Sequence, residues 1–151
     1  MGQNIVIMAT NSLKIQRFRA NDLVDNGGKQ FELGRSWCDD FFEFNRDDTE
    51  VVINLTFKSL CNEYEKYTNK NIELKLSEVS TRGDRKAYVN GENGRSQIKD
   101  FFIKDLQLTV ENNSEDYFGV YKSNLGEYYL YFIPRPLYEN FIKMFTSLAP
   151  N

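Results

Sequence analysis

Short stretches in which apolar and polar residues alternate recur along this chain, and this pattern constrains its fold most. In the longest, residues 50–58, the apolar side chains on one face are Val51, Ile53, Leu55 and Phe57. Successive side chains of a β-strand point to opposite faces, so such a stretch predicts a half-buried strand. Further strands are predicted at residues 4–9, 12–18, 72–76, 87–89, 106–110, 117–122 and 127–133.

Two short helices complete the predicted inventory. Residues 59–67 offer Ser59 as an N-cap and apolar residues at helical spacing, and a second helix is expected to start at Pro136. No repeat, low-complexity tract or linker interrupts the 151 residues, so a single domain spanning residues 1–151 is expected. The prediction is a mainly β protein with two short helices (α+β), arranged as a seven- to eight-stranded, partly open barrel.

The absence of histidine restricts the chemistry open to the chain. With no histidine, the commonest general base and the commonest metal ligand are missing, as is every Ser-His or Cys-His nucleophile. An enzyme built on this sequence would have to use carboxylates, lysine and an oxygen-bound metal.

The remaining composition predicts a cytoplasmic protein with no membrane contact. Cys38 and Cys61 are the only cysteines, too few for a disulfide framework, and they are interpreted as thiols in a reducing compartment. The longest apolar runs cover only a few residues, far short of a membrane span. The first ten residues lack the charged and apolar regions of a secretory signal.

The net charge of −3 hides a segregation of basic and acidic residues. Residues 14–35 hold five basic and three acidic side chains, and residues 82–104 hold six basic and three acidic ones. These two segments therefore carry +5 together, while the rest of the chain carries −8. An acidic body with two basic segments is compatible with DNA binding, because the local field steers association more than the global charge does.

The two basic segments are also rich in side chains that recognise nucleic acid. The first contains Gln16-Arg17-Phe18-Arg19-Ala20-Asn21-Asp22, then Gly27-Gly28-Lys29-Gln30, and reaches Arg35. The second contains Arg82, Arg85, Lys86, Tyr88 and Asn90, followed by Asn93-Gly94-Arg95-Ser96-Gln97. Arginine, glutamine and asparagine can bond base edges in the major groove, whereas lysine is better suited to phosphate. The alternative for each segment is a surface loop with solvated charges.

Taken together, the segments resemble the DNA-binding pseudobarrel family, which includes the recognition domains of EcoRII- and BfiI-type restriction endonucleases and of plant transcription factors. That family carries a Ser-Ala-Asn-Asp-like turn, then Gly-Gly-His-Gln, and later a Tyr-Asn strand followed by an Arg-Asn-Glu-x-Arg-like stretch. The matching residues here are Arg19-Ala20-Asn21-Asp22, Gly27-Gly28-Lys29-Gln30, Tyr88-Val89-Asn90 and, loosely, Asn93-Gly94-Arg95-Ser96-Gln97. Lys29 stands where the family has histidine, and Ser96 or Gln97 stands where it has a charged residue.

The resemblance implies a pseudobarrel that embraces double-stranded DNA with two arms, the N-arm (residues 21–35) and the C-arm (residues 82–97). No catalytic residue, metal or cofactor is expected in the chain. Cleavage would fall to a nuclease or motor domain, fused or associated, within a restriction system for phage defence. The expected DNA-contacting residues are Arg17, Arg19, Asn21, Lys29, Gln30, Arg35, Arg82, Arg85, Lys86, Tyr88, Asn90, Asn93, Arg95 and Gln97.

Two other functions remain open at the level of sequence. Glu73-Leu74-Lys75, with Asp47 and Asp48 upstream, resembles the metal-binding core of PD-(D/E)xK nucleases. A Glu-x-Lys pair is also frequent on solvated strand faces, where side chains at i and i+2 are neighbours. The acidic pI of about 5.1 favours a third function, a protein-interaction module or inhibitor.

Overall fold

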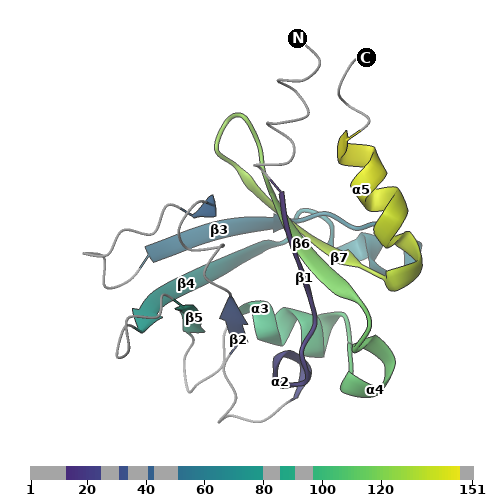
Figure 1. Ribbon diagram of the computed structural model, residues 1–151, viewed down its shortest axis with the longest axis horizontal. Coiled ribbons are helices and arrows are strands. Elements are labelled where there is room, and N and C mark those ends of the chain that lie inside the picture. Colours follow the sequence, from purple (N-terminus) through teal and green to yellow (C-terminus); the bar gives the residue numbers. More distant parts are fainter. Residues whose placement is uncertain are drawn as a thin grey trace.

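The computed structural model describes residues 13–24, 31–33, 41–42, 51–79, 86–90 and 97–146, and the fold is given for these residues (Figure 1). They form a mixed α+β structure, which confirms the predicted class. The strands are β1 (Leu13–Arg17), β2 (Phe31–Leu33), β3 (Val51–Phe57), β4 (Asn71–Val79), β5 (Lys86–Asn90), β6 (Tyr117–Lys122) and β7 (Tyr128–Ile133). The helical segments are α2 (Ala20–Leu23), η2 (Asn62–Tyr67), α3 (Gln97–Asp100), η4 (Phe101–Asp105), α4 (Val110–Asn113), η5 (Arg135–Leu137) and α5 (Tyr138–Thr146).

The strands join in the order β1-β6-β7-β3-β4-β5-β2. Every neighbouring pair is antiparallel except β3 and β7, which run parallel. The predicted strand at residues 4–9 lies outside the described residues. For that reason the seven- to eight-stranded, partly open pseudobarrel stays a prediction for the whole chain.

The core lies between the sheet and the helix formed by α3 and η4. On β3, Ile53, Leu55 and Phe57 are buried while Val52 remains 48% exposed, which confirms the predicted alternation. Their neighbours on β4 are Ile72 and Leu74, both buried, through the register Leu55↔Ile72 and Ile53↔Leu74. The helix contributes three further side chains to this core, Ile98, Phe101 and Phe102.

A second, smaller cluster lies on the other face of β6 and β7. Helix α5 covers this face, with the Phe141 ring 5.1 Å from Tyr131 and the Tyr138 ring stacked 4.3 Å from Tyr117 (Figure 1). Pro136 lies in η5, directly before α5, so the predicted C-terminal helix is confirmed. The strands predicted at residues 117–122 and 127–133 are confirmed as the antiparallel pair β6 and β7, and Gly126 supplies the positive φ of the turn between them.

Two expectations about local structure were wrong. The alternation of Leu106, Leu108 and Val110 does not form a strand. The Leu106 and Leu108 N–H groups donate to the Phe101 and Phe102 carbonyls at 3.0 and 2.9 Å, which ends the preceding helix, and Gln107 between them takes a positive φ of 57°. Both leucines are buried by this turn, so a helix end produces the period-2 pattern of a strand.

The second wrong expectation is the count of two helices. The described residues contain four short α-helices, and α2, α3 and α4 were not expected. Each of these three spans four residues, too few to show a helical period in the sequence. The helix expected at residues 59–67 is the 3₁₀ helix η2, beginning at Asn62. No helix within the described ranges is long and apolar enough to cross a membrane.

Candidate nucleic-acid interface

The two segments predicted as DNA-binding arms lie side by side in the sheet. Strand β2 belongs to the N-arm and strand β5 to the C-arm, and they pair antiparallel with the register Phe31↔Val89, Glu32↔Tyr88 and Leu33↔Ala87. Strand β5 pairs in turn with β4, from Lys75↔Asn90 to Val79↔Lys86. The sheet therefore joins two basic segments that are separated by about fifty residues of sequence.

The N-arm begins from a firmly held stretch at the end of β1. The Phe18 N–H donates to the Asp116 carbonyl at 3.0 Å, and the Phe18 ring lies edge-on to Phe102 at 5.0 Å. The Arg17 Nε–H donates to the Ser114 carbonyl at 3.2 Å. Both residues are thus fixed to the connection between α4 and β6, and Phe18 also contacts the core helix.

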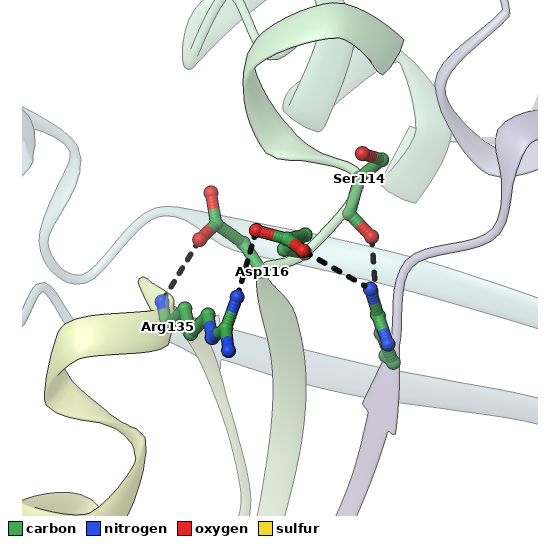
Figure 2. A network of polar contacts seen from close by, with 5 residues as sticks. Ser114, Asp116 and Arg135 are labelled. Atoms are coloured by element: carbon green, nitrogen blue, oxygen red, sulfur yellow. Dashed lines mark hydrogen bonds and ion pairs between the residues drawn. The ribbon is translucent and has the colours of Figure 1, made fainter.

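Arg17 belongs to a polar network with acidic neighbours (Figure 2). Its guanidinium lies 3.8 Å from one Glu115 oxygen, and Arg135 Nη1 donates to the other at 2.8 Å. The Arg135 N–H also donates to Asp116 at 2.8 Å. The Arg17 and Glu115 side chains are both more than half exposed, so this predicted DNA contact already has a carboxylate neighbour at the surface.

Residues 19–22, expected as a turn, form the first part of a helix instead. Arg19 is the N-cap of α2, with extended φ and ψ, and its N–H donates to Asp22 Oδ2 at 2.9 Å. An acidic side chain three residues after the N-cap satisfies an amide that the helix leaves unpaired. The Arg19 Nε also lies 3.7 Å from the same oxygen. Asn21, a predicted contact, lies within this helix.

Asp22, one of the three acidic residues in residues 14–35, is buried, with only 1% of its surface exposed. Desolvation raises the pKa of its carboxyl group above the ordinary value. The Arg19 hydrogen bond and the charges of Arg19 and Lys99 act in the opposite direction but do not cancel the effect of burial. Lys99, on α3, is itself 4% exposed. The Asp22 carboxyl group of α2 and the Lys99 ammonium group of α3 are therefore both buried, and the charge of Lys99 acts on Asp22.

The C-arm ends at α3, and Gln97 fixes that helix to the sheet. Gln97 Oε1 accepts a hydrogen bond from the Glu73 N–H at 3.0 Å. The pairing of β4 with β5 begins at Lys75, so the Glu73 N–H has no acceptor on β5. The side-chain oxygen of Gln97 accepts its hydrogen bond instead. Gln97 was expected to contact DNA, and in the structure its oxygen braces α3 against β4.

This series of elements is here called the arm-root ring. It runs from β4 to β5 and β2 through backbone pairing, and from β2 to the adjacent α2. Asp22 of α2 and Lys99 of α3 are both buried, and the charge of Lys99 acts on the Asp22 carboxyl group. The Gln97–Glu73 hydrogen bond joins α3 to β4. Sequence patterns did not reveal the ring because each side-chain contact links residues distant in sequence. Only the spacing of Arg19 and Asp22, at i and i+3, gave a local signal.

The structure describes the backbone of three further predicted contacts, Lys86, Tyr88 and Asn90, at alternate positions of β5. The other predicted contacts lie outside the described residues: Lys29, Gln30, Arg35, Arg82, Arg85, Asn93 and Arg95.

The Glu-x-Lys pair of the nuclease alternative lies on β4. Lys75 Nζ is 3.7 Å from Glu73 Oε1, and the residue opposite Glu73 on β3 is Asn54, not an acid. No group of three potential ligands for a metal ion occurs among the described residues, and Asp47 and Asp48 lie outside them.

No protein-family model matches the chain, and no curated protein matches it at a significant level.

Proposed function

We propose that this chain is a sequence-specific, double-stranded DNA-binding domain that grips the major groove with its N-arm and C-arm. The observation that carries the proposal is the β2–β5 pairing. Two segments that were selected from sequence for their basic and amide side chains meet along one edge of a single sheet. Residues 14–35 and 82–104 together carry a net charge of +5, and two such segments on one sheet edge can contact the same stretch of duplex together, whereas scattered surface loops cannot.

The finer fold proposed is a partly open pseudobarrel. Strands β1 and β2 lie at the two ends of the strand order, yet α2, which follows β1 almost directly, lies against β2. The end of one edge strand thus returns toward the other edge, as expected of a sheet that curls toward closure. The arm-root ring supports this arrangement.

The proposed role is target recognition for a restriction endonuclease system, with the cleaving domain located elsewhere. The base-reading residues are Gln30, Arg35, Arg85, Asn90 and Arg95, and the lysines contact phosphate. Binding is expected to depend strongly on salt despite the net charge of −3. If three to six arm cations contact phosphate, log K should fall against log[salt] with a slope of about −3 to −5.

A binding titration of arm variants tests the proposal. Arg85→Ala or Arg95→Ala should cost about 1–3 kcal/mol on the cognate duplex and relax the preference at one base position. Lys29→Ala or Lys86→Ala should weaken all duplexes nearly equally and reduce the salt slope by about one unit. Glu63→Ala and Glu65→Ala, two exposed acids on η2, serve as controls and should change neither quantity.

The same preparation separates the proposal from its alternatives. We expect no cleavage of duplex DNA with magnesium or manganese. Metal-dependent cleavage that disappears in Glu73→Ala and Lys75→Ala would replace the binding domain with the PD-(D/E)xK nuclease. Absence of duplex binding at low salt would leave the protein-interaction module as the better proposal.

A further inference from the structure

We infer that the β1-β6-β7 end of the sheet carries a nucleotide-binding site, in which two arginines bind a phosphate group and a pair of stacked tyrosines receives the base. The arginines are Arg17 and Arg135, and the tyrosines are Tyr117 and Tyr138. The structure describes all four residues, and none of them belongs to the N-arm or the C-arm. The inference therefore goes beyond the proposed function and does not depend on it.

Two guanidinium groups from distant parts of the chain converge on one carboxylate (Figure 2). Arg135 Nη1 donates to one Glu115 oxygen at 2.8 Å, and Arg17 Nη2 lies 3.8 Å from the other. Both arginines are oriented by the backbone between α4 and β6. The Arg17 Nε–H donates to the Ser114 carbonyl at 3.2 Å, and the Arg135 backbone N–H donates to Asp116 at 2.8 Å. Because like charges repel, two converging guanidinium groups define a position for an anion, which the glutamate fills.

Glu115 is a weak occupant of this position. Its side chain and those of both arginines are more than half exposed, and ion pairs at such sites contribute little net free energy. A phosphate group carries more charge than a carboxylate and has more oxygens, so it can bond both guanidinium groups at once. A phosphate can therefore replace the carboxylate while the Glu115 side chain turns toward solvent.

A cleft beside the anion position gives room for the rest of the ligand. Its volume is about 520 Å³, and its lining includes Tyr117, Arg135, Tyr138, Glu139 and Asn140. Volumes of about 300–1,000 Å³ are typical of sites for small ligands. The two tyrosine rings are stacked, with their centroids 4.3 Å apart and their planes 24° from parallel. Bases stack on such rings, and the amide of Asn140 can bond a base edge.

A nucleotide is the ligand that uses both parts of the site, because Arg135 belongs to the anion position and to the cleft. Asp116, bonded to the Arg135 N–H, and Glu139 in the cleft offset the charges of the two arginines once Glu115 has turned away. Binding then relies on short contacts and stacking, not on a basic patch. The nucleotide can be free or can be the phosphorylated end of a DNA strand.

Titration of the full chain with adenosine 5′-monophosphate, followed by NMR shifts of the backbone amides, tests the site. We expect saturable shifts at residues 114–117 and 135–140, with adenosine and inorganic phosphate each binding about tenfold more weakly. A 5′-phosphorylated trinucleotide that binds more tightly than the mononucleotide would identify the end of a strand as the ligand. Equal or weaker binding of the trinucleotide would identify the free nucleotide.

Three variants assign the two parts of the ligand. Arg135→Gln should weaken the mononucleotide about tenfold, because a charge-assisted hydrogen bond to phosphate is lost. Lys66→Gln is the matched control: it removes another exposed cation that lies beside a tyrosine ring, and it should change the affinity less than about twofold. Tyr138→Leu should abolish the preference for the mononucleotide over inorganic phosphate. A preference that persists would overturn the placement of the base.

Glu115→Gln separates a specific site from a general loss of structure. Removal of the competing carboxylate should tighten binding of the mononucleotide about fivefold, a gain that a misfolded protein would not show. Absence of shifts with the mononucleotide and the trinucleotide, or equal affinities in the wild type, Arg135→Gln and Glu115→Gln, would overturn the inference. A wild type that binds the mononucleotide but not duplex DNA would keep this site and contradict the proposed function.

Discussion

The two ends of the sheet are held together by different kinds of contact. At the β1-β6-β7 end, aromatic rings pack on both faces, with Phe118 against Phe18 and Phe102 on one side and Tyr131 against Phe141 on the other. At the β4-β5-β2 end, the arm-root ring depends on backbone pairing, one amide contact and a buried pair of charges. Buried aromatic area contributes strongly to the stability of a fold, whereas a buried charged group must offset the cost of its own desolvation.

The two ends of the sheet therefore contribute differently to the stability of the fold. The β1-β6-β7 end, here called the aromatic end, can supply the stability of the domain, because apolar burial is the dominant favourable term in folding. The arm-root ring, by contrast, joins β2, β5 and β4 by backbone pairing and buries the Asp22 carboxyl group at a cost in desolvation. The predictions below test this difference between the two ends.

The largest expected effect is on stability at the aromatic end. Phe118 is fully buried on β6, and its ring lies 5.2 Å from Phe18 and 5.7 Å from Phe102. Phe118→Ala should lower the free energy of unfolding by about 3–5 kcal/mol, through lost burial and the cavity left behind. Urea unfolding measures this, with Phe118→Leu expected to lose less than half as much. A loss below about 1 kcal/mol would show that the aromatic end is not where stability resides.

A smaller loss of stability is expected from a methyl group added at Gly119, where the aromatic end has no room for one. A Cβ on Gly119 would lie 3.1 Å from Ile133 Cδ1, 3.2 Å from Ile15 Cγ1 and 3.3 Å from the Lys14 carbonyl oxygen. Gly119→Ala should therefore force β1 and β7 apart slightly and cost about 1–3 kcal/mol of unfolding free energy. Gly119→Ala combined with Ile133→Val should regain part of that loss, since the second change removes the nearest carbon. No regain would locate the strain at β1, in the Ile15 side chain or the Lys14 carbonyl.

The sequence predicted the aromatic end better than the arm-root ring, for a physical reason. Burial alternates on β3, where Ile53, Leu55 and Phe57 are buried and Val52 is exposed, so its position could be predicted from period alone. Strands β6 and β7 are packed on both faces, and their runs of apolar and aromatic residues made them predictable as strands. The same period misled at Leu106 and Leu108, where a helix end buries alternate residues. An alternating sequence indicates that every second residue is buried, and a helix end can bury alternate residues as a strand does.

The arm-root ring could not be predicted from local sequence patterns, because it consists of contacts between residues that are distant in the sequence. Nothing in the sequence around Asp22 distinguishes a buried carboxylate from a solvated one, and Lys99, whose charge acts on it, lies 77 positions further along the chain. Gln97 was selected as a DNA contact from its residue type, whereas its bond to Glu73 follows from where β5 begins to pair with β4. The net positive charge of residues 14–35 and 82–104 could be counted from the sequence. Their pairing through β2 and β5 was not.

A pH series distinguishes the buried charge of the ring from ordinary surface charge. The pKa of Asp22 is raised in the folded state, so the fold favours its protonated form. Its contribution to stability is therefore present in acid and is lost as the pH rises through the raised pKa. The stability of Asp22→Asn relative to the wild type should increase with pH over that window and then level off. A relative stability that falls with rising pH would show that its contacts outweigh its burial.

The smallest expected effect comes from an exposed charge at the aromatic end, which completes the contrast with Asp22. Glu115 bridges Arg17 and Arg135, but all three side chains are more than half exposed. Water screens such pairs, and ordering long side chains costs entropy, so Glu115→Gln should lower the unfolding free energy by less than about 1 kcal/mol. That loss should vanish in about 1 M salt, where charges are screened within roughly 3 Å. Glu63→Gln, an exposed glutamate on η2, controls for the change in net charge. A salt-resistant loss above about 2 kcal/mol would mean that the network of Figure 2 holds β1 in place, and the aromatic end would then depend on charge as the arm-root ring does.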